Sequence, residues 1–326
     1  MIPIAVLDDW QRVAGGSADW SALQGRAELT FLHEPFADED DAATKLAGFE
    51  VVLLLRERTP FPASLIDRLP KLRMIGATGA RTPSLDLAAC TRRGVLVCNT
   101  GGQKSGSSTA ELALGLMIAA ARRIPAGDRS IRTGSFQERV PPGIALEGRT
   151  LGVIGLGRIG SKMARYGSAL GMHVLAWSQN LTEEQAQAAG ARLVAKQELL
   201  AEADVVSLHL VLSDRTRGII SATDIAQMKP GAILVNTSRG PLVDEQGLLA
   251  ALQAGHIVAA LDVYNAEPLP AGHPLRSLPN TVLTPHLGYA VREVFSQFYR
   301  ESIENVLAFL EGNPIRVANP DVLSRA

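Results

Sequence analysis

Three spaced glycines follow a short apolar segment near the middle of the chain. The segment Leu151–Ile154 predicts a β-strand, Gly155-Leu156-Gly157-Arg158-Ile159-Gly160 follows it, and Ser161–Leu170 predicts a helix. The first glycine permits a tight turn, the second lets the backbone approach a pyrophosphate, and the third lets helix and strand pack closely. Because a helix N-terminus attracts anions, this pattern with a further strand at His173–Ala176 predicts a dinucleotide-binding unit.

The residues after that second strand give only a weak indication of which dinucleotide binds. An NAD site is expected to place Asp or Glu there for the ribose hydroxyls. This sequence instead reads Ala176-Trp177-Ser178-Gln179-Asn180, with neither a carboxylate nor a basic residue for a 2′-phosphate. We expect Ser178 or Asn180 to bind the ribose, and NAD to be the cofactor. Discrimination against NADP should be modest because no carboxylate repels its phosphate.

The rest of the chain shows the alternation of predicted strands and helices that is typical of an α/β protein. Its 326 residues exceed what one hydrophobic core usually organises, so two domains are expected. Short apolar runs alternate with helical patterns, which predicts doubly wound parallel sheets covered by helices. The first series of predicted strands comprises Ile2–Leu7, Leu29–Leu32, Val51–Leu55, Leu72–Ile75 and Val95–Val97. The second series comprises Leu151–Ile154, His173–Ala176, Arg192–Val194, Val205–Leu208, Ala232–Val235, Val258–Leu261 and Val282–Leu283.

Two long helices are predicted at the junctions between these series. Ser108-Thr109-Ala110-Glu111 has the form of a capping box and opens an apolar helix that runs to about Ala121. A second helix, Val291–Leu310, is stopped by Gly312-Asn313-Pro314. Between them, Ile124–Gly148 shows no clear periodicity, and we expect an arm or a loop that packs on a partner subunit.

Composition excludes several classes of protein. The net charge of −1 gives no attraction to nucleic acid or to an anionic membrane. The longest apolar run, Leu112–Ala121, is too short to span a bilayer, and the N-terminal residues lack the basic region of a signal peptide. The only cysteines, Cys90 and Cys98, do not have metal-ligand spacing. These features predict a cytoplasmic protein without a metal site.

Three charged or titratable residues follow successive strands of the second series. Arg239 follows Leu234–Ser238, Glu267 lies in the segment after Val258–Leu261, and His286 ends the sequence Val282-Leu283-Thr284-Pro285-His286. Ligands of doubly wound sheets bind at the carboxyl ends of the strands, so these side chains can converge. Singly, each has an ordinary structural alternative, such as a surface ion pair or a hydrogen-bonded strand end. Together, behind a dinucleotide motif, they predict an active site.

The chemistry of the three residues suits a hydroxy acid. A guanidinium binds a carboxylate through two parallel hydrogen bonds, which is the role expected for Arg239. Hydride transfer to a keto carbon leaves charge on oxygen, and His286 would supply the proton. A carboxylate beside an imidazole favours its charged form and fixes its tautomer, the role expected for Glu267.

Four stretches of the sequence resemble those of the D-isomer-specific 2-hydroxyacid dehydrogenases. They are Gly155–Gly160, Asn236–Gly240, Leu261–Pro268 and Thr284–Gly288. The resemblance covers nearly the whole chain from about Val51. It implies a flavodoxin-like substrate domain of residues 1–100 and 291–326, and a Rossmann domain of residues 101–290. It also implies an active site between the domains, and a homodimer.

The resemblance further assigns individual contacts. It implies that the dinucleotide is contacted by Thr109, Gly155, Gly157, Arg158, Ile159, Gly160, Ser178, His209, Thr216, Thr237 and Asp262. The backbone of a glycine-rich turn would hold the substrate carboxylate, here at Gly79, Ala80 and Arg81. Relatives usually have glycine where Arg81 stands and Asp-Asn where Pro83-Ser84 stand, so the fit to the substrate is open. Arg56 is an additional expected substrate contact.

Three other functions share this scaffold. Formate dehydrogenases have Gln in place of the carboxylate partner of the histidine, so Glu267 argues against them. Phosphite dehydrogenase has the same three catalytic residues and remains an alternative. The C-terminal-binding corepressors use dinucleotide to control assembly, and are a non-enzymatic alternative. They typically carry disordered tails, which this sequence does not offer after Pro320.

Overall fold

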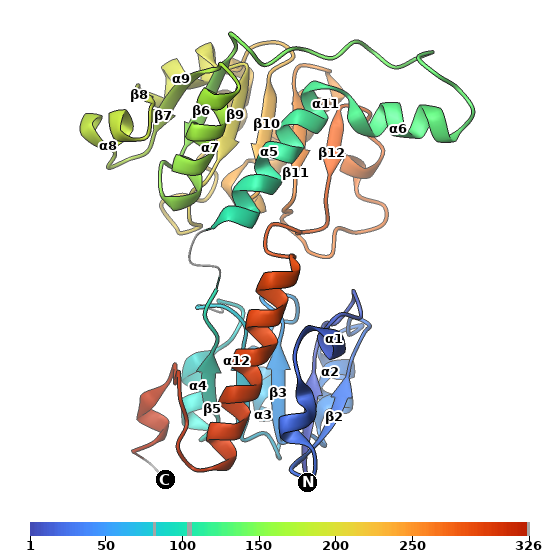
Figure 1. Cartoon of the computed structure of the whole chain (residues 1–326), viewed down its shortest axis with the longest axis vertical. Helices are drawn as coiled ribbons and strands as arrows, with labels where there is room; N and C mark the ends of the chain where they lie inside the picture. The colour runs from blue at the N-terminus through green and yellow to red at the C-terminus, as the bar shows by residue number, and fades with distance from the viewer. Residues whose placement is uncertain (81–82, 103–105, 325–326) are drawn as a thin grey trace. The chain divides into compact units, whose positions relative to one another are not determined.

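The structure is a computed structural model, which describes residues 1–80, 83–102 and 106–324. The chain divides into two compact units. Unit 1 consists of Met1–Lys104 together with Val291–Ala326, and unit 2 is Ser105–Ala290. Unit 1 is thus built from both ends of the chain, and each unit has its own sheet (Figure 1).

Unit 1 contains a five-stranded parallel sheet in the order β2-β1-β3-β4-β5. Its strands are β1 Ile2–Val6, β2 Ala27–Phe31, β3 Val51–Leu54, β4 Met74–Ala77 and β5 Leu96–Asn99. Its α-helices are α1 Ala14–Ser17, α2 Glu39–Leu46, α3 Ala63–Asp67, α4 Leu87–Arg92 and α12 Arg292–Leu310. Two 3-10 helices, η1 Trp20–Leu23 and η4 Pro320–Val322, complete it. All four residues of β3 and of β4 are buried, as expected for parallel strands covered on both faces.

Unit 2 contains a seven-stranded parallel sheet in the order β12-β11-β10-β9-β6-β7-β8. Its strands are β6 Thr150–Ile154, β7 His173–Trp177, β8 Arg192–Leu193, β9 Val205–Leu208, β10 Ile233–Asn236, β11 Val258–Leu261 and β12 Thr281–Leu283. Its α-helices are α5 Ser107–Ala121, α6 Ile124–Arg132, α7 Arg158–Ala169, α8 Glu183–Ala188, α9 Lys196–Glu202, α10 Ala222–Gln227 and α11 Glu245–Gln253. The 3-10 helices are η2 Gly240–Leu242 and η3 Pro274–Arg276.

Alternate residues of the unit 2 strands enter two separate cores, one on each face of the sheet. Val153 and Val235 pack with Met117 of α5 on one face. Ile154 and Leu234 belong to the core on the other face, which includes residues of α9, α10 and α11. Such two-sided burial is the driving force for a doubly wound sheet, since side chains alternate along each strand.

The strand order reverses between β6 and β9, and ligands of such sheets bind at the carboxyl ends of the strands at this point. The glycine motif follows β6, and His209 follows β9. The predicted fold class, two Rossmann-like doubly wound parallel sheets, is confirmed. Each strand predicted from the sequence overlaps an observed one, although β4 begins two residues later than predicted.

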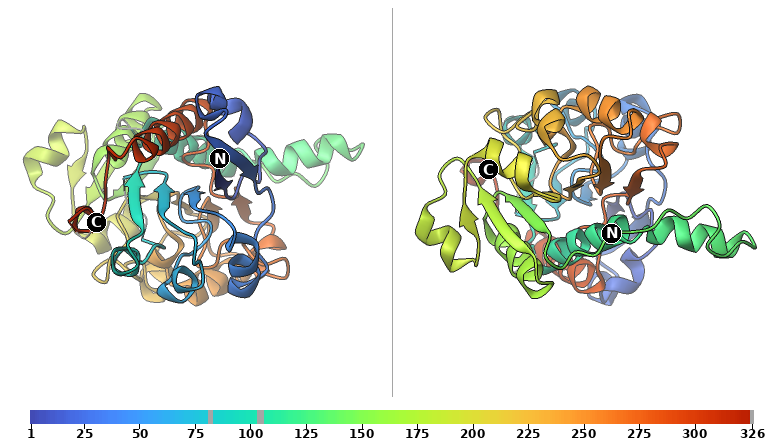
Figure 2. Two further views of the ribbon diagram at one scale, coloured as in Figure 1. Left: turned by 90° about the horizontal axis from the view of Figure 1, so that it is seen from below. Right: turned by 90° about the horizontal axis from the view of Figure 1, so that it is seen from above.

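One local prediction was wrong. The helix α5 begins at Ser107 rather than after a capping box, and its N-cap is Gly106 in the left-handed conformation (φ +64°). The segment for which an arm or a loop was expected begins with a helix, α6, at Ile124–Arg132. None of the nine described residues of α6 is buried. Figure 2 shows α6 and the chain after it extending away from the sheet of unit 2.

Within the described part of the chain, no helix has the length and apolar character needed to cross a membrane.

Candidate active site

The glycine turn after β6 has the geometry that a bound pyrophosphate requires. Gly155 has φ +95°, and a Cβ added there would collide with the carbonyl of His209. A Cβ on Gly160 would overlap the carbonyl oxygen of Gly155. Among the described residues, no atom outside the turn itself lies within 4 Å of the Cβ position of Gly157, so a ligand can approach the backbone there.

The helix α7 begins at this turn, with Gly157 as its N-cap. No described side chain caps it, and its dipole therefore favours an anion at the turn. Arg158 is exposed and Ile159 half-buried in its first turn.

Two buried polar atoms near this turn lack hydrogen-bond partners among the described residues. They are Oγ1 of Thr237, just after β10, and Nδ1 of His209, just after β9. The other imidazole nitrogen of His209 lies 2.9 Å from Oγ of Ser207. Burial lowers the pKa of His209 to about 4, so its imidazole is neutral near pH 7. Unpaired buried groups beside an open glycine turn fit a dinucleotide that supplies polar atoms of its own.

The remaining predicted nucleotide contacts lie in unit 2, but some are already engaged. The Thr216 hydroxyl donates to the carbonyl of Val211 (2.7 Å) and accepts from the Ser213 N–H (2.8 Å), so it shapes its own loop. Thr109, in the first turn of α5, donates to the carbonyl of Gly288 at 2.9 Å. Ser178 is half-buried directly after β7.

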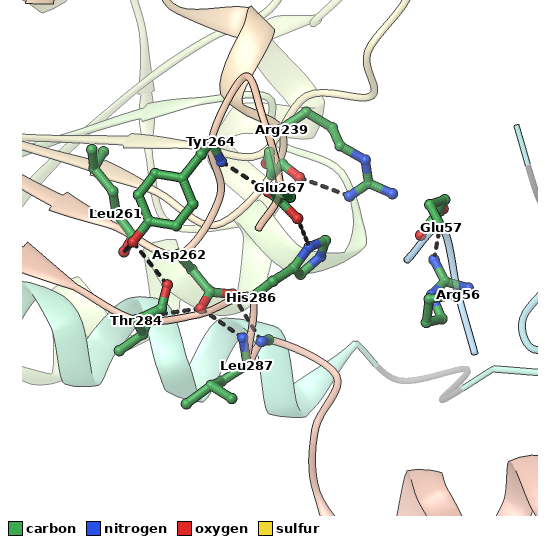
Figure 3. Close-up of polar contacts among 12 residues, drawn as sticks. Arg56, Glu57, Arg239, Leu261, Asp262, Tyr264, Glu267, Thr284, His286 and Leu287 are labelled. Atoms are coloured by element: carbon green, nitrogen blue, oxygen red, sulfur yellow. Dashed lines mark hydrogen bonds and ion pairs between the residues drawn. The ribbon is translucent and has the colours of Figure 1, made fainter. Parts of the chain in front are cut away.

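The catalytic candidates Arg239, Glu267 and His286 occupy the loops after β10, β11 and β12. Nδ1 of His286 lies 2.6 Å from Oε2 of Glu267 (Figure 3). Because Nδ1 is engaged in this way, Nε2 is the imidazole nitrogen left to face a substrate. The structure therefore brings the histidine and the carboxylate within hydrogen-bond distance of each other.

Glu267 is kept ionised by its neighbours. Burial, the largest single influence, raises the pKa of its carboxyl. The hydrogen bond and charge of His286, the Tyr264 N–H that donates to Oε1 at 2.8 Å, and the charge of Arg239 together outweigh burial. The net result is a pKa below the usual range.

The loop that carries His286 is held by Asp262, which is completely buried. One carboxyl oxygen of Asp262 accepts from the Thr284 hydroxyl (2.6 Å) and the Leu287 N–H (2.7 Å), and the other from the Gly288 N–H (2.8 Å). The backbone carbonyl of Asp262 accepts from the His286 N–H at 2.9 Å. Four hydrogen bonds thus fix the backbone around His286, which itself has φ +55°.

Arg239 is positioned by its backbone. The Asn236 side chain donates to the Arg239 carbonyl (2.9 Å) and accepts from the Ser238 N–H (3.0 Å), which fixes the loop after β10. The Arg239 guanidinium donates to the carbonyl of Ser238 at 2.7 Å. It lies close enough to Glu267 to lower the pKa of that carboxyl.

Sequence reasoning missed two aromatic residues of this site. The ring of Tyr289 meets the His286 imidazole edge to face, with centroids 5.6 Å apart. The Tyr264 hydroxyl donates to the carbonyl of Thr284 at 2.9 Å, which ties the Glu267 loop to β12. The spacing of Tyr289, three residues after His286 on one tight turn, is the signal that could have suggested the first contact.

In unit 1, the predicted substrate residues Arg56, Gly79 and Ala80 cluster at the carboxyl ends of β3 and β4. The Gly79 N–H donates to the hydroxyl of Thr100 at 2.9 Å, and Gly79 has φ +91°. The carbonyl of Ala80 accepts from the Asn99 side chain at 3.2 Å. Arg81, also predicted to bind substrate, lies outside the described residues.

The fold and this site define a class of protein, namely a doubly wound, dinucleotide-binding protein with a histidine–carboxylate pair at its strand ends. The family model of the D-isomer specific 2-hydroxyacid dehydrogenase NAD binding domain matches residues 114–288, and the chain belongs to this family. The resemblance read from the sequence is thereby confirmed.

Named relatives agree with this assignment. The chain is 39% identical over 267 residues to a D-3-phosphoglycerate dehydrogenase of Archaeoglobus fulgidus, covering 82% of this chain and 50% of the relative. It is 38% identical to a glyoxylate reductase of Aeropyrum pernix, covering 79% and 80%. A crystal structure of a phosphoglycerate oxidoreductase from Vibrio cholerae is 39% identical, with a TM-score of 0.91 over 96% of this chain and all of that one. The chain thus spans about half the length of the Archaeoglobus relative.

Proposed function

We propose that the chain is a nicotinamide-dependent dehydrogenase that interconverts a small D-2-hydroxy acid and its 2-keto acid. The observation that carries the proposal is the 2.6 Å hydrogen bond between His286 and Glu267, at the strand ends of the sheet that bears the glycine turn. Membership of a family of 2-hydroxyacid dehydrogenases supports the same reaction.

When bound, the nicotinamide supplies or accepts the hydride. The residues of the chain transfer the proton and stabilise the charges that form. In reduction, His286 holds a proton at Nε2 and donates it to the carbonyl oxygen of the keto acid. In oxidation, the neutral imidazole accepts the hydroxyl proton. Glu267 fixes the tautomer from the Nδ1 side and stabilises the imidazolium, while Arg239 binds the carboxylate and polarises the carbonyl.

We also keep the backbone turn of unit 1 as a proposed substrate contact. Because the Gly79 N–H already donates to Thr100, the amides that follow it, those of Ala80 and Arg81, are the proposed donors. Gly79 is then needed for the shape of the turn rather than for a hydrogen bond to substrate.

NAD is the proposed cofactor. The residues Ser178, Gln179 and Asn180 after β7 carry no charge that would hold a 2′-phosphate, and none that would repel it. The preference for NAD should therefore be modest. The proposed contacts are the eleven predicted from the sequence, with Thr237 and His209 supported by their unpaired buried atoms.

We also propose that the protein is a cytoplasmic homodimer. The arm that comprises α6 and the following residues exposes Ile124, Ile131 and Phe136, which are 52%, 56% and 68% accessible. Apolar side chains concentrated on a projecting segment are typical of a surface that a second copy covers. Cys90 and Cys98 are buried free thiols, which fits a reducing compartment.

The test is a steady-state assay of the full chain. Glyoxylate, pyruvate and hydroxypyruvate are each assayed with NADH and with NADPH, and phosphite is assayed with NAD and with NADP. The proposal predicts keto-acid reduction with NADH, and a somewhat lower catalytic efficiency with NADPH. Turnover of phosphite alone, or binding of dinucleotide without turnover of any substrate, would contradict it.

A further inference from the structure

Tyr264, which follows β11, is in direct contact with the carboxylate of the histidine–carboxylate pair. Its backbone N–H donates to Oε1 of Glu267 at 2.8 Å. The other oxygen of this carboxylate, Oε2, lies 2.6 Å from Nδ1 of His286. The Tyr264 N–H and the imidazole therefore hold the two oxygens of one carboxylate between them (Figure 3).

The side chain of Tyr264 reaches the end of β12. Its hydroxyl donates to the Thr284 carbonyl at 2.9 Å and lies 3.3 Å from the Leu261 carbonyl. The His286 N–H donates to the same Thr284 carbonyl at 3.1 Å, so one oxygen atom joins the phenol to the backbone of His286. Burial, followed by the charges of two nearby carboxylates, raises the pKa of the phenol, so the hydroxyl keeps its proton for this bond.

The backbone of Tyr264 also contacts the loop that carries Arg239. Gly240 directly follows Arg239 and begins η2. A Cβ added to Gly240 would collide with the Tyr264 carbonyl and with the Asn265 nitrogen, so the peptide bond between these two residues packs directly against Gly240. The loops after β10, β11 and β12 thus all meet at Tyr264, which is 9% exposed and packs in the core of unit 2.

We propose that Tyr264 is a positioning residue for the reaction, which fixes the Glu267 carboxylate and the His286 imidazole relative to each other. The proposal rests on the proposed function. Tyr264 acts through the other two residues, because its N–H holds one of them and its hydroxyl holds the loop of the other. Loss of the hydroxyl would let the His286 loop shift against Glu267, and small shifts of a proton donor slow a reaction strongly.

The test variant is Tyr264→Phe, which removes the hydroxyl and keeps the ring in the core. Single-turnover reduction by bound NADH is measured with whichever of glyoxylate, pyruvate and hydroxypyruvate the wild type reduces most efficiently. Only protein that binds NADH contributes to this signal, so a partly unfolded sample does not distort the rate. Keto-acid concentration is varied to give the maximal rate and the half-saturating concentration, and NADH affinity is measured by fluorescence. Tyr166→Phe is the matched control, since Tyr166 is a half-buried tyrosine of α7 in the same unit.

A second comparison separates positioning from a general structural role. Tyr264→Phe is also made in the Glu267→Gln background, and the same rate is measured in both single variants and in the double variant. Residues that act on one another give non-additive effects, whereas independent losses multiply. If Tyr264 acts by aligning the carboxylate with the imidazole, removal of its hydroxyl should matter less once that carboxylate is gone.

We expect Tyr264→Phe to lower the maximal rate by ~10-fold, with the half-saturating concentration and the NADH affinity close to wild type. In the Glu267→Gln background, the same change should lower the rate by less than ~3-fold. Tyr166→Phe should keep the wild-type rate. A wild-type rate in Tyr264→Phe, or an equal fold decrease with and without the Glu267 carboxylate, would overturn the inference. Absence of turnover of every keto acid by the wild type would instead contradict the proposed function.

Discussion

Two carboxylates in the segment after β11 interact with His286 or its loop in different ways. Glu267 contacts the imidazole, and its pKa is lowered because hydrogen bonds and nearby positive charge outweigh burial. Asp262 accepts from the Thr284 hydroxyl before His286 and from the Leu287 and Gly288 amides after it, and burial raises its pKa despite these three donors. Glu267 thus contributes the negative charge beside the imidazole, and Asp262 fixes the conformation of the loop that carries it.

The first prediction concerns Glu267→Gln. The amide accepts a weaker hydrogen bond from Nδ1 and carries no charge to stabilise a protonated imidazole, so keto-acid reduction should slow by about 10-fold or more. The measurement is kcat for keto-acid reduction, with a deuterated cofactor to verify that chemistry limits the rate. A variant with the wild-type kcat under these conditions would contradict the pairing.

The second prediction concerns Asp8, which is 1% exposed at the end of β1. Burial raises its pKa to about 6, against the hydrogen bond from Thr59 and the charge of Arg58. Since the folded pKa exceeds the unfolded value of 3.8, this group contributes stability at low pH that is lost as pH rises through 6.

Asp8→Asn should remove that loss. The free energy of unfolding of the variant, relative to wild type, should increase by about 1–2 kcal/mol between pH 5 and pH 8. Urea denaturation at both pH values measures it, with the exposed Asp67→Asn as control. Equal pH dependence in wild type and Asp8→Asn would show that Asp8 does not titrate as described.

At the scale of elements, the junction of β6 and α7 is constrained at Gly160. An alanine there would overlap the carbonyl of Gly155, so the turn must open. We predict that Gly160→Ala weakens NADH binding by at least ~10-fold, since the turn shapes the pyrophosphate site. Fluorescence titration measures the affinity. Gly115→Ala, in open space on α5, is the control, and equal affinities in the two variants would contradict the prediction.

Much of the fold was predictable because its strands are short apolar runs between helical patterns. The same pattern of short apolar runs located the glycine motif, and it placed Arg239, Glu267 and His286 after the ends of predicted strands. What could not be read depends on contacts distant in sequence. The Gly79 N–H is taken by Thr100, 21 residues away, and Asp262 holds backbone amides 25 and 26 residues away.

The start of α5 and the presence of α6 were both misjudged for local reasons. A capping box at Ser108 is a valid local signal, but Gly106 in the left-handed conformation starts the helix earlier. The helix α6 contains Pro125 and Gly127, which have low helix propensity, although Ile124 and Ile131 lie seven residues apart on one face.

At the scale of the whole molecule, the C-terminal segment returns to complete unit 1. The buried Asn319 side chain accepts from the Val97 N–H at 2.8 Å and donates to the Val95 carbonyl at 2.9 Å. These side-chain bonds attach the C-terminal segment to the β5 region, more than 200 positions away in sequence.

The projecting arm leads to a prediction about assembly. If a second copy covers α6, the double variant Ile131→Asp, Phe136→Asp should be monomeric, because charge is placed in an apolar interface. Sedimentation equilibrium measures the mass. Leu323→Asp, at a site of 49% exposure in unit 1, should remain dimeric. A wild type of monomer mass, or a double variant that stays dimeric, would contradict the homodimer.

The central claim is that His286 transfers the proton that accompanies hydride transfer. Its most direct test is single-turnover reduction of hydroxypyruvate by bound NADH in His286→Ala and His286→Gln, followed by NADH absorbance. The account predicts NADH affinity close to wild type, and a hydride-transfer rate lower by about 10²–10⁴-fold. A rate near that of the wild type, with an isotope effect from deuterated NADH showing that hydride transfer limits it, would contradict the account.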